Sequence, residues 1–259
     1  MAVILHAQGL NKSFGAVTAA SNVDVLVEKD SIVGLIGANG AGKTTFINLI
    51  TGYLKPDTGA ILFEERDITR LPPRDITRLG ICRSFQMPQL YSSLSVYENM
   101  MVGLGVVLRN AGRGGYFSRG RPQVPGYDAP AEEVARRILE RFGLTEYRDN
   151  NAQGLPGGVR KLLDIALTMV AKPRILLLDE PTSGVSAQEK FGIMEMVLNA
   201  VRAEGATVLF VEHDMEVVSR FAQRVLAFYD GRIIADATPE IALADPEVKR
   251  YVVGGLPRA

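Results

Sequence analysis

The sequence predicts an α/β fold with a mainly parallel β-sheet, and three observations support this prediction. Apolar runs at 32–36, 175–178 and 208–211 have the length and composition of strands that are buried on both faces. Between the last two runs, apolar side chains recur at helical spacing from Phe191 to Val201, which is typical of strands that alternate with helices. The 259-residue chain is 47% hydrophobic, which supplies enough apolar side chains for a large core.

Both ends of the chain add further β-structure to this prediction. A short apolar run at 3–5 and the alternating valines over 23–27 indicate strands with one buried face, and we expect an N-terminal antiparallel β subdomain there. Near the other end, 225–229 and 232–235 flank Asp230-Gly231, a dipeptide typical of the tight turn of a β-hairpin.

The middle of the chain has a helical pattern instead. Apolar side chains share one helical stripe over 130–143 and another over 162–169. We therefore predict an α/β core of about 1–85 and 174–259, with a helical subdomain of about 86–173 inserted between its two parts.

Within the insertion, residues 103–126 are rich in glycine and arginine and predict a long surface loop. Four arginines and no acidic residue occur between positions 99 and 127. These are Arg109, Arg113, Arg119 and Arg121. A plain solvated loop and a docking surface for a partner or for lipid headgroups are both open interpretations.

Composition excludes several classes of function. The chain has 29 basic and 29 acidic residues, so a bulk electrostatic attraction to nucleic acid is not indicated and no nucleic-acid partner is expected. The single cysteine, Cys82, excludes an internal disulfide and a cysteine-based zinc site, and it suits a reducing cytoplasm. Because the longest apolar stretch, 100–108, is too short to span a bilayer and no signal peptide is evident, we expect a cytoplasmic protein.

A phosphate-binding loop is the strongest motif in the sequence. The segment fits G-x-x-x-x-G-K-[ST] and lies between a predicted strand and a predicted helix, which disfavours a chance glycine-rich turn. Its backbone N–H groups, the helix N-terminus and Lys43 would bind phosphate oxygens, and the Thr44 hydroxyl can ligate Mg²⁺. The residues are Gly37, Ala38, Asn39, Gly40, Ala41, Gly42, Lys43, Thr44 and Thr45.

Two carboxylates and a histidine are predicted at the same edge of the sheet. Asp179 and Glu180 follow the strand at 175–178, and His213 follows the strand at 208–211. We expect Asp179 to reach the Mg²⁺ shell and Glu180 to polarise a water that attacks the γ-phosphate. His213 is expected to contact the γ-phosphate, whereas His6 has no such context and is expected to be structural.

Together these motifs resemble the nucleotide-binding subunit of an ABC transporter, over nearly the whole chain, so the resemblance implies a single domain of that type. It implies ATP and Mg²⁺ as cofactors and ATP hydrolysis as the activity. Phe14, in Lys12-Ser-Phe-Gly15, looks like the family's aromatic residue that stacks on adenine. Gln86 matches the glutamine that joins the core to the helical region, where it contacts Mg²⁺ and reports the γ-phosphate to the membrane partner.

The signature segment of that family, 155–161, departs from its usual sequence. Leu155, Gly157 and Gly158 match residues that bind ATP held by an opposite subunit, through backbone N–H groups at a helix N-terminus. The usual serine and glutamine are replaced by Pro156 and Val159, and Ser186 stands where a loop between the subunits usually has an aspartate. Because the chain's own phosphate loop and acids are complete, we hypothesise an asymmetric dimer with a different ATPase subunit.

The branch of the family is also indicated by resemblance. The insertion after Glu98, the run 212–218 and the ending 245–251 look like importers of the branched-chain amino acid type, whose relatives also take up urea, amides or aromatic acids. This implies two transmembrane permease subunits, a periplasmic solute-binding protein and a position on the inner face of the cell membrane.

Three alternatives to this interpretation differ in how well they fit the sequence. A soluble ABC ATPase acting on ribosomes or DNA is disfavoured by the single phosphate loop and the lack of a long heptad run. A GTPase or small-molecule kinase would leave Gln86, the signature segment and His213 unexplained. A nucleotide-gated subunit with weak hydrolysis, in an exporter or another complex, is compatible with Pro156.

Overall fold

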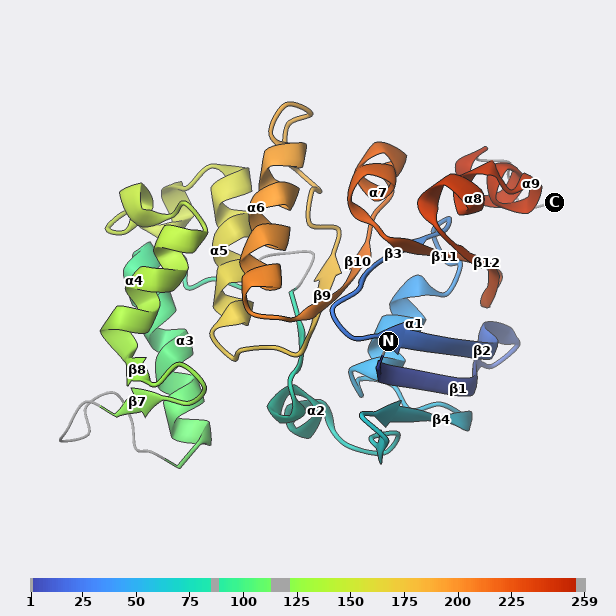
Figure 1. The fold of residues 1–259 in the computed structure, drawn as a ribbon, viewed down its shortest axis with the longest axis horizontal. Coiled ribbons are helices and arrows are strands. Elements are labelled where there is room, and N and C mark those ends of the chain that lie inside the picture. Colours follow the sequence, from blue (N-terminus) through green and yellow to red (C-terminus); the bar gives the residue numbers. More distant parts are fainter. Residues whose placement is uncertain (1, 85–88, 113–121, 255–259) are drawn as a thin grey trace. The chain divides into compact units, whose positions relative to one another are not determined.

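The computed structural model describes residues 2–84, 89–112 and 122–254, and the chain divides into two compact units (Figure 1). The first unit contains 1–83, 175–181 and 205–259, and the second contains 84–174 and 182–204. The predicted division into an α/β core and a helical subdomain stays a prediction. The two units differ from it in one segment, because 182–204 belongs to the second unit rather than to the core.

The first unit is built on a six-stranded sheet in the order β12-β11-β3-β10-β9-β6. All neighbours are parallel except the β11–β12 hairpin, which confirms the predicted mainly parallel sheet. The central strands are almost wholly buried, as their apolar runs indicated. The strands are β3 (Ile32–Ile36), β6 (Ile81–Arg83), β9 (Ile175–Asp179), β10 (Thr207–Val211), β11 (Arg224–Tyr229) and β12 (Arg232–Ala237).

A second, antiparallel sheet in this unit has the order β2-β1-β4-β5, as predicted for the N-terminal region. Its strands are β1 (Val3–Phe14), β2 (Val17–Glu28), β4 (Thr58–Phe63) and β5 (Arg66–Asp67). In β2 the alternating valines at 23–27 are buried, while the residues between them are exposed. The alternation therefore gives this sheet one face toward the core and one toward solvent.

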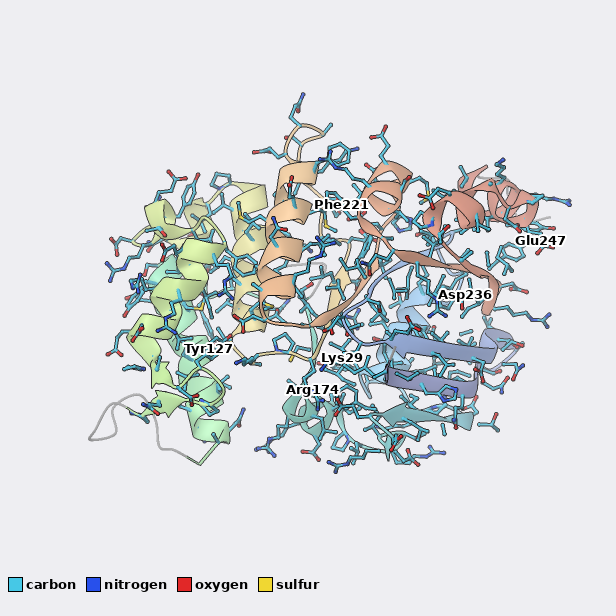
Figure 2. The ribbon with its side chains drawn as sticks, in the orientation of Figure 1. Lys29, Tyr127, Arg174, Phe221, Asp236 and Glu247 are labelled. Atoms are coloured by element: carbon cyan, nitrogen blue, oxygen red, sulfur yellow. The ribbon has the colours of Figure 1, made fainter. Side chains whose placement is uncertain are left out.

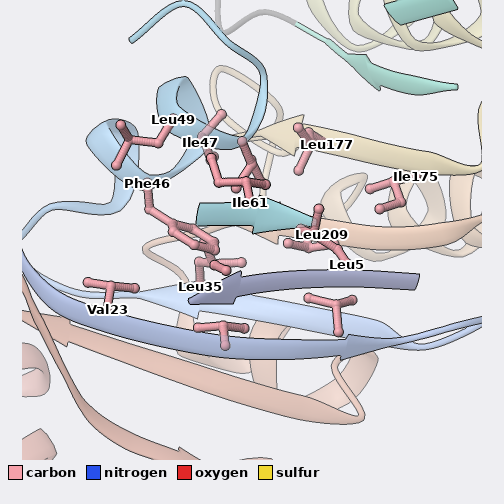
Figure 3. Packing of buried hydrophobic residues seen from close by; sticks show 14 of the residues in the cluster. Leu5, Val23, Leu35, Phe46, Ile47, Leu49, Ile61, Ile175, Leu177 and Leu209 are labelled. Carbon is pink, nitrogen blue, oxygen red and sulfur yellow. The ribbon is translucent and has the colours of Figure 1, made fainter. Parts of the chain in front are cut away.

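The core of the first unit joins both sheets through helix α1 (Lys43–Ile50). Figure 3 shows Phe46 and Ile47 of α1 close to Leu35 of β3 and Ile61 of β4. Phe46 also lies against Phe228 of β11, with ring centroids 5.6 Å apart. Each such side chain contributes about 1.5–3 kcal/mol on burial, so this cluster holds the helix that follows the phosphate loop.

The remaining elements of the first unit are short helices. They are α2 (Pro73–Leu79), α7 (Met215–Phe221), α8 (Pro239–Ala244), α9 (Pro246–Val248) and a π-helix, Lys249–Val253. The β11–β12 hairpin is fixed by a bidentate ion pair. Arg224 Nε and Nη2 donate to the two carboxylate oxygens of Asp236 at 2.5 and 2.6 Å (Asp236 is labelled in Figure 2).

The second unit is mainly helical, as predicted for the insertion. Its helices are α3 (Val96–Asn110), α4 (Ala131–Arg141), α5 (Gly157–Met169) and α6 (Lys190–Ala203), with 3₁₀ turns at Thr145–Tyr147 and Ala152–Gly154. Two short strands, β7 (Gln123–Val124) and β8 (Ala129–Pro130), form a hairpin beside them. The Tyr127 hydroxyl in this hairpin donates to Met169 O at 2.7 Å, and burial raises its pKa.

The predicted loop at 103–126 is wrong over its first part, because residues 103–110 belong to helix α3. Ser95 and Glu98 form a capping box that starts this helix. Met100, Leu104 and Leu108 then lie at helical spacing and are fully buried, which outweighs the low helix propensity of the glycines between them. Arg109 is thus helical, and Arg113, Arg119 and Arg121 lie outside the described residues.

Within the described residues, none of the helices combines the length and the apolar character needed to cross a membrane.

Candidate functional site

The phosphate loop, Gly37–Thr45, lies where the motif requires it, between the buried strand β3 and helix α1. Two of its glycines are demanded by the backbone. Gly37 has φ +150°, and a Cβ there would lie 2.5 Å from Phe228 O. Gly42 has φ +111°, and its Cβ would lie 2.8 Å from Ala19 O. Any other residue would meet backbone at both positions, so the loop keeps this shape only with glycine.

Two neighbouring hairpins hold the loop in place. The Gly231 N–H, in the β11–β12 turn, donates to Ala41 O at 3.0 Å. Gly231 O in turn accepts from the Ser21 N–H of β2 at 2.8 Å. These backbone contacts therefore preorganise the loop, so that its shape does not depend on the ligand.

Lys43 is folded into the loop and is only 6% exposed. Its ammonium group donates to Gly37 O at 2.6 Å and to Ala38 O at 3.0 Å. Burial lowers the pKa of Lys43, and the charges of Glu180 and Asp179 oppose this shift. Among the described side chains none caps α1, so its first N–H groups are left for an anion at the same place.

Asp179 ends strand β9 and is neutralised by a residue that the sequence analysis missed. Arg83 of β6 donates from Nη2 to Asp179 Oδ2 at 2.6 Å and from Nη1 to Asn48 Oδ1 of α1 at 2.7 Å. The Arg83 and Asp179 side chains are 12% and 14% exposed. The sequence signal for this contact is weak, because only a short apolar pair precedes Arg83. In the structure this pair and Arg83 form β6, an outer strand of the same sheet.

Glu180 and His213 are brought together at the same edge of the sheet. Val211 of β10 pairs with Asp179, and the Glu180 N–H donates to Val211 O at 3.1 Å. Glu180 has φ +47°, an uncommon conformation for a residue with a side chain and one that clusters at functional sites. His213 Nε2 lies 3.3 Å from Glu180 Oε1, and the imidazole is about half exposed. The two side chains thus lie close together within the first unit, and the roles predicted for them stay predictions.

The residues available for a metal ion are oxygen ligands rather than a preformed cluster. In the part of the chain that the structure describes, no group of three or more His, Cys, Asp or Glu could hold an ion. Thr44 is exposed at the first turn of α1, and Asp179 is partly exposed. One hydroxyl and one carboxylate suit Mg²⁺, which usually takes few protein ligands and completes its shell with phosphate oxygens and water.

Of two further predicted site residues, the structure describes Phe14 but not Gln86. Phe14 lies at the end of β1, beside the turn into β2, and is 49% exposed. Gln86 lies outside the described residues, so its place at this site stays a prediction.

The signature segment, Leu155–Lys161, belongs to the second unit and opens helix α5. Leu155 is buried, and Gly157 and Gly158 are the first two residues of the helix. Pro156 occupies the N-cap position, and the described side chains give this helix end no cap. In the same unit the Ser186 hydroxyl donates to Glu189 Oε2 at 2.6 Å. The helix start therefore presents N–H groups that side chains of the described segments leave open.

Comparisons with known proteins identify a family and relatives that match most of the chain. The family model described as "ABC transporter" matches residues 20–183. The probable branched-chain amino acid transport ATP-binding protein LivG of Archaeoglobus fulgidus is 35% identical over 254 residues, covering 97% of this chain and 95% of the relative. The high-affinity branched-chain amino acid transport ATP-binding protein LivG of Salmonella typhimurium is 36% identical, covering 97% and 98%.

Solved structures are similar over the same length. The ADP conformation of an ATP-binding cassette of an ABC transporter has a TM-score of 0.81 and 30% identity, covering 96% of this chain and 98% of that one. A nucleotide-free ATP-binding cassette from an ABC transporter has a TM-score of 0.79 and 32% identity, covering 95% and 97%.

Proposed function

The chain belongs to the ABC transporter family, and we propose that it is the ATP-hydrolysing subunit of an importer for branched-chain amino acids. One observation carries the proposal: a complete phosphate loop shares the edge of one sheet with Asp179, Glu180 and His213. The solute is assigned because relatives named for branched-chain amino acid transport match nearly the full length of both chains.

The phosphate loop would bind the β- and γ-phosphates of ATP. The backbone N–H groups of Ala38–Ala41 and of the first turn of α1 donate to phosphate oxygens, and Lys43 supplies a positive charge. Lys43 now donates to carbonyl groups of the loop itself, so it must exchange these partners for phosphate oxygens when ATP binds. Phe14, half exposed at its hairpin, would stack on the adenine.

Mg²⁺ would be held by the Thr44 hydroxyl and the Asp179 carboxylate, together with Gln86. When bound, the ion neutralises charge on the phosphates and on the leaving group. Arg83 already pairs with Asp179 Oδ2 at 2.6 Å, which fixes the direction of this carboxylate before any metal arrives.

Glu180 would act on the water that attacks the γ-phosphate. Its carboxylate follows β9 at the sheet edge and is suited to accept a proton from that water or to orient it. His213, 3.3 Å from Glu180 Oε1, fixes the direction of this carboxylate and offers a second donor for the γ-phosphate.

The chain would work in an assembly at the inner face of the cell membrane. We expect two permease subunits, a second ATPase subunit and, indirectly, a periplasmic solute-binding protein. A different second ATPase is favoured because Pro156 offers no hydroxyl and no N–H at the segment that would complete the partner's ATP site. The chain's own ATP would then be hydrolysed faster than the ATP facing Pro156.

The first test replaces the proposed base. Glu180→Gln should lower ATP turnover at least about 100-fold and leave ATP affinity nearly unchanged, because the amide keeps the shape but takes no proton. Glu65→Gln, in the exposed β4–β5 turn, is the control and should keep full turnover. Full turnover in Glu180→Gln, measured by phosphate release, would contradict the assigned chemistry.

The second test uses the assembly purified from membranes and placed in liposomes with its solute-binding protein. We expect leucine, isoleucine or valine to stimulate ATP turnover, whereas stimulation by urea alone would overturn the assigned solute. The same assembly tests whether the two ATPase subunits differ. Glu180→Gln in this chain should lower the transport rate more than the equivalent change in the second ATPase. Equal losses would count against an asymmetric pair.

A further inference from the structure

A single carboxylate ties the hairpin that carries Phe14 to the segment that follows the phosphate-binding helix. Asp57 lies between α1 and β4. Its Oδ1 accepts from the Lys12 ammonium at 2.6 Å, and its Oδ2 accepts from the Ser13 N–H at 2.8 Å. The Asp57 N–H donates to Asn11 O at 2.8 Å. Three successive residues of β1 are thus bound to one residue.

On one side, β1 loses its sheet partner β4 at this point, while on the other side β2 continues to pair with it as far as Phe14 opposite Val17. β1 pairs with β4 from Leu5 onwards, the register shifts between Gln8 and Asn11, and Asn11 opposite Thr58 is the last pair. The Asn11 side-chain amide donates to Thr58 Oγ1 at 3.0 Å, which closes the end of this ladder. Beyond it, Asp57 supplies the contacts that β4 supplies to the rest of β1.

Phe14 depends on this arrangement because the protein covers only about half of its side chain. The ring is 49% exposed, and the described contact to it comes from the Lys12 ammonium, 5.6 Å from the ring centroid. The same ammonium is held by Asp57. The position of the ring therefore follows from the pairing of Phe14 with Val17 on the β2 side, and from the backbone at Ser13 and the direction of Lys12 on the other.

We propose that Asp57 is a positioning residue for nucleotide binding, which sets the place of Phe14 for the adenine through Lys12 and Ser13. The inference rests on the proposed ATP site and on the role of Phe14 within it. The chain runs from the phosphate loop through α1 to Asp57, so this residue links the end of the site that binds phosphate to the end that binds the base.

The charge on Asp57 is stable over the working range of pH. The hydrogen bonds from Lys12 and Ser13 lower the pKa of Asp57 below its ordinary value. Its carboxylate is therefore ionised at neutral pH, and both acceptor contacts persist there.

Two ligands separate positioning from a general structural defect. Asp57→Ala should weaken ATP binding about three- to tenfold, the size expected for losing hydrogen bonds at an exposed site. Inorganic tripolyphosphate has no base to stack, so its affinity should be unchanged. Asp57→Asn keeps an acceptor for the Ser13 N–H and should restore part of the ATP affinity.

Asp67→Ala is the matched control. Asp67 likewise accepts a backbone N–H, from Thr69 at 2.8 Å, but it lies in β5, which does not pair with β1. Its removal should leave ATP affinity unchanged. In a Phe14→Ala background, Asp57→Ala should cause little further loss, because both changes remove the same interaction.

The outcomes distinguish this inference from the function on which it rests. Unchanged ATP affinity in Asp57→Ala, with a clear loss in Phe14→Ala, overturns the positioning role and leaves the ATP site intact. Equal losses for ATP and tripolyphosphate in Asp57→Ala also overturn it. Unchanged ATP affinity in Lys43→Ala would instead overturn the ATP site itself, and unchanged affinity in Phe14→Ala would overturn both roles assigned to the hairpin.

Discussion

The phosphate loop and the signature segment are both glycine-rich and both open a helix, yet they use glycine for different reasons. In the phosphate loop, Gly37 and Gly42 have positive φ, and a Cβ on either would lie within 2.8 Å of a backbone oxygen. In the signature segment, Gly157 and Gly158 are helical residues without positive φ. A Cβ on Gly157 would lie 3.3 Å from Gly184 O, and one on Gly158 would meet side chains, Ile193 Cδ1 at 2.9 Å and Val185 Cγ1 at 4.0 Å.

This difference shows which segment is complete within the chain. The fold demands glycine in the phosphate loop, because another residue would collide with backbone that anchors the loop. The fold makes no such demand on the signature segment. Glycine there suits close approach to the backbone by a group from outside the chain, as the proposed ATP of a second subunit would require.

The largest effect should come from adding a methyl group to the phosphate loop. Gly42→Ala puts a Cβ 2.8 Å from Ala19 O at φ +111°. Strain and crowding together should lower the free energy of unfolding by about 3 kcal/mol. Urea denaturation followed by circular dichroism measures this. An unchanged midpoint would mean that the loop can accommodate the Cβ, contrary to the close contact with Ala19 O.

A smaller and different effect is expected from Gly157→Ala. Alanine suits helical φ and ψ, which offsets the contact with Gly184 O, so the free energy of unfolding should change by less than about 1 kcal/mol. The methyl group would stand between the N–H groups and the ATP of the second subunit. ATP turnover of the assembled transporter should nevertheless fall about tenfold, because the two subunits would have to close around both ATP molecules before the faster site can act.

The proposed difference between the two segments is wrong if Gly157→Ala changes stability as Gly42→Ala does, or if it leaves turnover unchanged. A large loss of stability in Gly157→Ala would show that the fold itself needs this glycine. Normal turnover of the assembly, with normal stability, would show that nothing outside the chain approaches the segment.

Much of the parallel sheet could be predicted because each central strand is a short apolar run buried on both faces. The phosphate loop, Asp179, Glu180 and His213 were predictable for a related reason. Each follows such a run within two residues, and parallel strands that share a sheet bring their carboxyl ends to one edge. Glu180 and His213 are 33 positions apart in the printed sequence and lie in contact distance for this reason.

What the sequence could not reveal depends on contacts between distant segments. Arg83 meets Asp179 and Asn48, which are 96 and 35 residues away, only because the three-residue strand β6 pairs with β9. The apolar pair before Arg83 is too short a pattern to predict a strand by itself. Helix α3 was predicted as a loop beyond residue 102 because its glycines suggested one, whereas buried Leu104 and Leu108 decide the conformation.

The smallest effect concerns a glycine on which neither the fold nor a ligand makes a demand. Gly105 lies inside α3, and among the described residues no atom comes within 4 Å of a Cβ added to it. Gly105→Ala should therefore raise the free energy of unfolding by about 0.5–1 kcal/mol, through better helix propensity and a less flexible unfolded chain.

Gly103, two residues earlier in the same helix, is the control because its Cβ would lie 3.2 Å from Leu167 Cδ2. Gly103→Ala should gain less than Gly105→Ala or lose stability, since the leucine must move. The melting curves of Gly105→Ala and Gly103→Ala give the stability change for a glycine-to-alanine substitution in this helix, without and with a close neighbour of the added Cβ. Gly157→Ala, with its neighbour at 3.3 Å, should fall between them, and a loss larger than that of Gly103→Ala would mean that the signature glycine serves the fold after all.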